Sequence, residues 1–187
     1  MPGPLFLGLA RRVIPVILIV AGVSGSGKTT VGALLAGRLR WRFADADTFH
    51  PAANVAKMRS GIPLTDADRV PWLHAIGEWM DLQIAEGHSA VVTCSALKRA
   101  YREQLLIRRP TATMVFLLVS REVLERRLMT RPDHFFPEKL LESQLAAFEP
   151  PAPDEGIETV LSEGDPGQTA AKVIATIWPY GEPDTAS

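Results

Sequence analysis

The sequence predicts an α/β protein of three layers, in which helices cover both faces of a mostly parallel sheet of about five strands. Short apolar runs of strand length alternate along the chain with segments of helical period, the pattern of proteins with parallel sheets. The chain has 187 residues, of which 47% are hydrophobic, and its formal net charge is −1. One packed domain is therefore expected, rather than a disordered chain or one with a strong surplus of charge.

The predicted elements follow in order. The first strand, an apolar run over 14–21, is shorter than the ~20 residues needed to cross a membrane. Later strands are predicted at 42–45, 90–94, 112–119 and 157–161. Helices are predicted at 28–40, 66–86, 98–109, 122–129 and 137–148, and after Asp165. Asp68 is the expected cap of the long helix, with Pro71 in its first turn, and Asp165 is the expected cap of the last.

These elements predict a single domain over residues 13–179. Residues 1–12 are interpreted as an N-terminal extension, because their positive charges follow the short apolar stretch rather than precede it, unlike a secretory signal. Residues 180–187 form a C-terminal tail. Residues 130–136 separate two of the predicted helices.

A glycine-rich motif follows the first strand directly. Residues 22–29, GVSGSGKT, match G-x-x-x-x-G-K-[ST] in full, between a predicted strand and a predicted helix. Such a loop binds nucleotide phosphates with backbone amides, while Lys28 reaches the β- and γ-phosphates and the Thr29 hydroxyl ligates Mg²⁺. The candidate ATP-binding residues are Gly22, Ser24, Gly25, Ser26, Gly27, Lys28, Thr29 and Thr30. The alternatives are a simple connecting turn, or a nucleotide switch without phosphotransfer.

Two carboxylates follow the second predicted strand. Asp45 and Asp47 are two residues apart, so on extended chain both face the same side. The carboxyl ends of parallel strands border the ligand crevice. Asp45 is a candidate to hold Mg²⁺ through water, and Asp47 is a candidate catalytic base for the attacking hydroxyl. The alternative for either residue is a helix cap.

Several segments of the chain resemble the gluconate kinases, relatives of shikimate kinase within the P-loop NTPase fold. The resemblance spans about residues 16–178. It is carried by 22–29 (GVSGSGKT), 45–51 (DADTFHP), 63–64 (PL), 71–73 (PWL), 94–98 (CSALK) and 134–136 (HFF). The 45–51 and 94–98 segments are more specific than the phosphate loop, which many families share.

The resemblance implies phosphorylation of gluconate by ATP at the 6-position, with Mg²⁺, in a homodimer. It implies that Asp47 and His50 line the sugar-acid pocket. It also implies positive side chains near the acceptor, at Arg69, Lys98 and Arg102. A lid at about 130–137 would be bracketed by Arg127, a further ATP-binding candidate, and by the catalytic candidate Arg131. His134 is a further substrate candidate, although Asp133 stands before it where this family usually has glycine. For Arg102, a solvated surface charge is the alternative.

The composition of the chain argues against other functional classes. The net charge offers no basic surplus for nucleic acid, and no membrane span is expected. One cysteine, Cys94, excludes an internal disulfide and suits the cytoplasm; it is expected to be a small buried residue rather than a nucleophile. A kinase of another small acid stays open, although shikimate kinases carry Gly-Gly-Gly where this chain has 93–97, TCSAL.

Overall fold

The computed structural model describes residues 14–129 and 138–182. The predicted extension 1–12, the predicted lid 130–137 and residues 183–187 of the tail lie outside the described residues. Five parallel strands form one sheet in the order β2-β3-β1-β4-β5. They are β1 (Ile17–Ala21), β2 (Arg42–Asp45), β3 (Ala90–Cys94), β4 (Ala112–Leu118) and β5 (Glu158–Leu161). The predicted α/β class and its five-stranded parallel sheet are confirmed.

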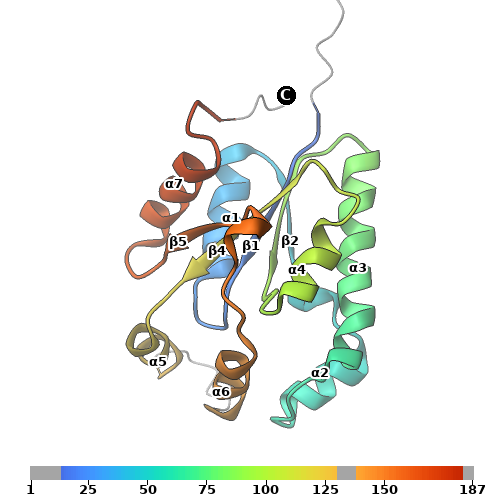
Figure 1. Ribbon diagram of the computed structural model, residues 1–187, viewed down its shortest axis with the longest axis vertical. Helices are drawn as coiled ribbons and strands as arrows, with labels where there is room; N and C mark the ends of the chain where they lie inside the picture. Colours follow the sequence, from blue (N-terminus) through green and yellow to red (C-terminus); the bar gives the residue numbers. More distant parts are fainter. Residues whose placement is uncertain (1–13, 130–137, 183–187) are drawn as a thin grey trace, which may run out of the picture.

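Helices cover both faces of the sheet, as Figure 1 shows. One face carries α1 (Lys28–Leu39) and α7 (Pro166–Ile177), and the other carries α3 (Asp66–Ala85) and α4 (Arg99–Leu106). Successive residues of β1 alternate between the two cores. Leu18 packs with α1 and α7, whereas Ile19 packs with α3 and α4, and all of β1 is fully buried. A strand buried on both faces explains the continuous apolar run in the sequence.

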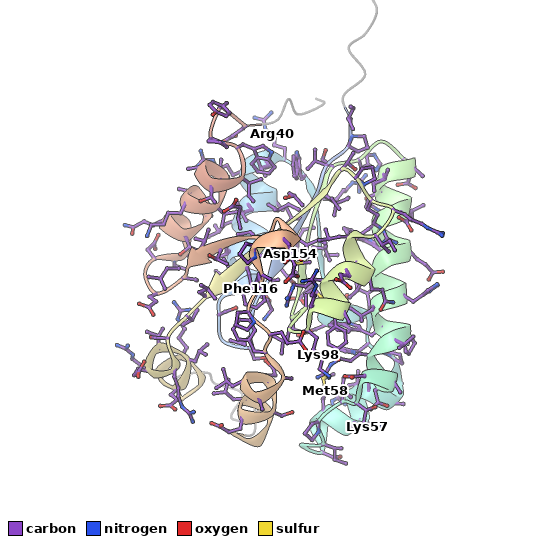
Figure 2. All side chains as sticks on the ribbon, in the orientation of Figure 1. Arg40, Lys57, Met58, Lys98, Phe116 and Asp154 are labelled. Atoms are coloured by element: carbon purple, nitrogen blue, oxygen red, sulfur yellow. The ribbon has the colours of Figure 1, made fainter. Side chains whose placement is uncertain are left out.

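Three further helices gather beyond the carboxyl ends of the strands, at the lower end of Figure 1. They are α2 (Ala52–Arg59), α5 (Arg121–Met129) and α6 (Glu138–Ala147). Short 3₁₀ helices lie at η1 (Ala46–Phe49) and η2 (Pro153–Glu155). α6 is anchored from its carboxyl end, where Phe148 stacks on the buried Phe116 at 5.0 Å between ring centroids (Phe116 is labelled in Figure 2). No helix among the described residues is both long and apolar enough to cross a membrane.

Two local predictions about α3 are wrong. Its cap is Thr65, not Asp68: the Thr65 hydroxyl accepts a hydrogen bond from the Asp68 amide, and the Asp68 carboxylate accepts one from the Thr65 amide. Asp68 is thus the third residue of the helix and the second half of a capping box. Because the helix begins at Asp66, Pro71 lies inside it, beyond the first turn. Asp165 caps α7, as predicted.

Candidate active site

The phosphate loop joins the buried end of β1 to the start of α1. Gly22 has φ +147°, and a Cβ there would lie 2.9 Å from the carbonyl oxygen of Leu117, so a side chain is excluded. Gly27, which precedes α1, has φ +92°. The Lys28 ammonium bends back over the loop and donates to the Val23 carbonyl at 2.9 Å. The loop thus has the curled backbone that turns amides and a lysine towards one anion.

Asp45 and Thr29 meet beside this loop. The Thr29 hydroxyl donates to Asp45 Oδ2 at 2.7 Å, and the other Asp45 oxygen accepts from the Asp47 amide at 3.1 Å. Asp45 therefore both caps η1 and reaches the phosphate loop. A hydroxyl that donates its hydrogen to Asp45 keeps lone pairs for a cation, and oxygen ligands suit Mg²⁺. Within the described ranges, no group of three or more His, Cys, Asp or Glu side chains could hold a metal by itself.

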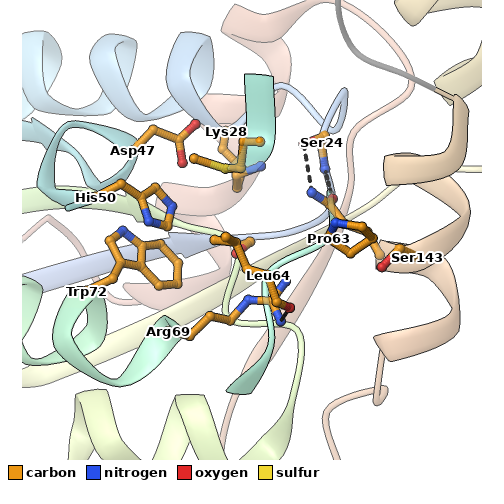
Figure 3. A pocket seen from close by; sticks show the side chains of 12 residues that line it. Ser24, Lys28, Asp47, His50, Pro63, Leu64, Arg69, Trp72 and Ser143 are labelled. Atoms are coloured by element: carbon orange, nitrogen blue, oxygen red, sulfur yellow. Dashed lines mark hydrogen bonds between the residues drawn. The ribbon is translucent and has the colours of Figure 1, made fainter. Parts of the chain in front are cut away.

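A cavity of about 100 Å³ opens next to the loop, and Figure 3 shows its main side chains. Lys28 and Asp47 lie on one side of it, and His50, Trp72 and Arg69 lie along another. Asp47 stands on η1, directly after β2, so its carboxylate faces the cavity rather than the Thr29 side that Asp45 faces. The prediction that both carboxylates face the same side is therefore wrong. Asp45 faces the phosphate loop and Asp47 faces the cavity, because the chain turns into η1 after Asp45 and does not continue as extended strand.

His50 is held as a neutral ring. It stacks on Trp72, with ring centroids 4.4 Å apart and planes 9° from parallel. Trp72 is fixed in turn by its ring N–H, which donates to the Ala46 carbonyl at 2.7 Å. Burial, and then the positive charge of Arg69, lower the pKa of His50 to about 4. An uncharged imidazole has one donor and one acceptor nitrogen. The Nδ1 atom of His50 already lies 3.5 Å from the Asn54 side-chain amide, which leaves Nε2 for a ligand. Trp72 is buried in the core and also lines the cavity.

A polar cluster borders the cavity at Arg69. The Arg69 guanidinium donates to the Leu64 carbonyl at 2.8 Å and lies 5.7 Å from the centroid of the Tyr101 ring. The Tyr101 hydroxyl donates to Asp66, and Lys98 donates to both Asp66 oxygens at 2.7 and 2.8 Å. Hydrogen bonds from Lys98 and Tyr101 lower the pKa of Asp66. Arg69 thus lines the cavity, whereas Lys98 is bonded to Asp66 and is not among the residues that line the cavity.

The prediction that Arg102 contacts the acceptor is wrong, and so is the surface-charge alternative. Its side chain is 1% exposed and forms a two-point ion pair with Glu155, at 2.7 and 2.8 Å. It also donates to the carbonyls of Leu97 at 3.0 Å and Glu149 at 2.9 Å. Arg102 therefore joins α4 to the segment after α6. Glu149 and Glu155 lie 47 and 53 residues after Arg102 in the chain, a separation that no local pattern reveals.

Cys94 is a small buried residue, as expected. It is fully buried at the end of β3, and burial raises the pKa of its thiol to about 12. A thiol that does not ionise is no nucleophile.

A second cavity, of about 370 Å³, lies on the other side of the phosphate loop. Gly25, Gly27 and Thr30 border it, with Arg127 from the end of α5 and Pro166 from the start of α7. The Arg127 guanidinium donates to the Gly25 carbonyl at 3.2 Å. One loop therefore separates two cavities, the larger beside Thr30 and Arg127 and the smaller beside Asp47. Arg131 and His134 lie outside the described residues.

Sequence reasoning missed the contribution of α6. Ser143 and Gln144 line the smaller cavity, and Figure 3 shows Ser143 on the side away from Asp47. Gln144 is hydrogen bonded to Ser24 of the phosphate loop. A serine and a glutamine on a predicted helix carry no local signal of a binding site. Only the packing of α6 against the loop brings them there.

A phosphate loop whose lysine shares a small cavity with a carboxylate is the arrangement of a P-loop kinase that acts on a small molecule, and this is the class that the fold and the site define. A family model described as an AAA domain matches residues 17–151. The gluconokinase of Gluconobacter oxydans (strain 621H) is 49% identical over 160 residues, covering 86% of this chain and 90% of that protein.

Two solved structures agree with this class. A gluconokinase from Sinorhizobium meliloti 1021 is 37% identical, with a TM-score of 0.76, covering 91% of this chain and 100% of that one. A sugar kinase from Janibacter sp. HTCC2649 is 42% identical, with a TM-score of 0.82, covering 87% of this chain and 94% of that one. The chain belongs to the gluconokinase family.

Proposed function

We propose that this chain is a gluconokinase, which transfers the γ-phosphoryl group of ATP to gluconate and forms 6-phosphogluconate. The observation that carries the proposal is 49% identity to a gluconokinase over most of both chains. The cavity suits such an acceptor. Arg69 provides a planar cation for a carboxylate, and His50 and Asp47 provide polar groups for hydroxyls. The 6-position rests on the family resemblance.

The reaction proposed is in-line attack by an acceptor hydroxyl on the γ-phosphorus. Asp47 lines the cavity that Lys28 also lines, so the hydroxyl that it deprotonates would lie next to the phosphate loop. As the new O–P bond forms, ADP leaves with the electron pair of the broken bond. Lys28 and the loop amides stabilise the charge on the transferred group, which is the main catalytic contribution in phosphoryl transfer.

Thr29 and Asp45 are proposed to hold Mg²⁺ together with the nucleotide. Their hydrogen-bonded oxygens form a hard donor pair of the kind that binds Mg²⁺ through one or two protein groups, water and phosphates. When bound, the ion would neutralise charge on the β- and γ-phosphates. The cavity beside Thr30 and Arg127 is proposed for the nucleoside. Arg131 and His134 of the 130–137 segment remain proposed catalytic and substrate residues, and Lys98 a proposed substrate residue, on the family resemblance.

The remaining proposals concern the whole protein. We infer a cytoplasmic homodimer with one kinase domain over residues 13–179, an extension at 1–12 and a tail at 180–187. The buried, unpaired Cys94 supports a reducing compartment, and the family resemblance supports the dimer. A formal net charge of −1 argues against a nucleic-acid partner, and no membrane association is proposed. Light scattering coupled to gel filtration measures the oligomeric state directly.

Incubation with ATP, Mg²⁺ and gluconate tests the function. ADP and 6-phosphogluconate should appear in equal amounts, with the phosphate position read by nuclear magnetic resonance. Asp47→Asn should keep nucleotide affinity, measured by calorimetry, and lose most turnover. Turnover of a different acid without turnover of gluconate would replace the substrate. Nucleotide binding with no acceptor-dependent ADP release from the wild type would indicate a switch instead.

A further inference from the structure

The side chain of Gln144 connects α6 to the phosphate loop. The backbone amide of Ser24 donates to Gln144 Oε1 at 2.8 Å, and Gln144 Nε2 donates to the Ser24 hydroxyl at 3.1 Å; Figure 3 marks these bonds at Ser24. The two residues are 120 positions apart in sequence. Two bonds from one planar amide fix its orientation, because both its oxygen and its nitrogen are engaged.

The helix that presents Gln144 is firmly placed. Leu141, one turn earlier, is 3% exposed, and Phe148, one turn later, stacks on Phe116. The Glu149 amide then donates to the Leu97 carbonyl at 2.9 Å. The Gln144 amide is thus held in place both by the packing of α6 and by its bonds to the phosphate loop. A group that recognises a ligand needs such support.

The two bonds to Ser24 use half of the hydrogen-bonding capacity of the Gln144 side-chain amide. A glutamine amide has two N–H donors and an oxygen with two lone pairs, and Ser24 uses one of each. Gln144 lines the same cavity as Lys28, Asp47 and His50. A sugar hydroxyl both donates and accepts, so an amide with one donor and one lone pair remaining is its natural complement.

We propose that Gln144 is a specificity-determining residue, which hydrogen bonds a hydroxyl of the polyol acceptor while Ser24 of the phosphate loop holds its amide in place. The proposal rests on the gluconate kinase function and extends it. A neutral amide in this position favours a polyhydroxy acid over acids that lack the matching hydroxyl. Because Ser24 lies next to the transfer site, the contact also ties acceptor position to the loop that holds the phosphates.

Gluconate affinity, measured by calorimetry with Mg·ADP present, tests the role of Gln144 separately from the kinase function. Gln144→Ala should bind gluconate about tenfold more weakly, the scale of one hydrogen bond and its unpaired partner, and should lose much less affinity for ADP, which is affected only through the Ser24 contact. Gln104→Ala, a matched change on α4 outside this cavity, should alter neither affinity. Wild-type protein that binds gluconate without phosphorylating it refutes the function alone. Equal gluconate affinity in wild type and Gln144→Ala overturns the inference alone.

Deoxygluconates, each lacking one hydroxyl, identify the contact. For the analogue without the hydroxyl that Gln144 reads, wild type and Gln144→Ala should bind alike, while the tenfold difference persists for the others. A uniform loss across gluconate and every analogue would show that Gln144 only positions the loop, which overturns the inference. Gln144→Glu provides a second variant of similar size: its carboxylate should weaken gluconate and ADP together, because both ligands are anions.

Discussion

Removing the guanidinium of Arg102 should destabilise the protein strongly while leaving its substrate affinity nearly intact. Arg102 is 1% exposed and Glu155 is 4% exposed, and their two-point contact is reinforced by backbone carbonyls on two other segments. Loss of one partner from a buried ion pair costs about 3–5 kcal/mol, because the other charge stays buried without compensation. For a chain of this length, that lowers the melting temperature by roughly 10 °C.

Urea unfolding of Arg102→Ala, followed by circular dichroism, measures this loss. Arg99→Ala is the matched control on the same helix: Arg99 pairs with Glu103 and Asp154 at the surface, where water screens the interaction, so its loss should be much smaller. Steady-state kinetics complete the test. A stable Arg102→Ala protein whose KM for gluconate rises more than about tenfold would refute the structural role and restore Arg102 as a substrate residue.

The same ion pair has a pH signature. Hydrogen bonds from Arg102 lower the pKa of Glu155 to about 2, from 4.5. The folded state therefore favours the carboxylate, and the stability that this provides is complete above pH 4.5 and is lost as the pH falls towards 2. The difference in unfolding free energy between wild type and Glu155→Gln should accordingly be constant above pH 4.5 and shrink below it. A difference that does not change with pH would contradict the charged pairing.

Three other predictions concern the active site. Lys28→Ala should lower kcat on the order of a hundredfold, the scale of one strong electrostatic donor, and near-normal turnover would contradict its role. The His50 ring should titrate near pH 4 in the folded protein, as read from its ring-proton shifts. Because the folded state disfavours protonated His50, this group should reduce stability as the pH falls from 6.5 towards 4, an effect that His50→Gln removes; a titration at 6.5 would be the opposing result. Asp45→Asn should raise the Mg²⁺ concentration needed for half-maximal activity, whereas an unchanged Mg²⁺ requirement would remove Asp45 from the metal site.

The positions of the strands along the chain and the phosphate loop could be predicted because their signals are local, whereas the order of the strands in the sheet was not predicted. A continuous apolar run such as Ile17–Ala21 is compatible with burial on both faces, and the loop motif needs glycines at fixed spacing whatever surrounds it. Local patterns were weaker at boundaries. Thr65 rather than Asp68 caps α3 because either side chain can accept from a nearby amide, and only the backbone path decides between them.

The sequence by itself determined the fold class, the phosphate loop and the presence of two carboxylates after the second strand, since each of these follows from neighbours in the chain. Only the tertiary structure decided the roles of Arg102 and Gln144. One is buried against Glu155 and the other is bonded to Ser24 across 120 residues. A charged or amide side chain has the same local pattern on the surface, in an ion pair or in a site. Which residues such a side chain contacts depends on how distant elements pack, so its role can be assigned only from the tertiary structure.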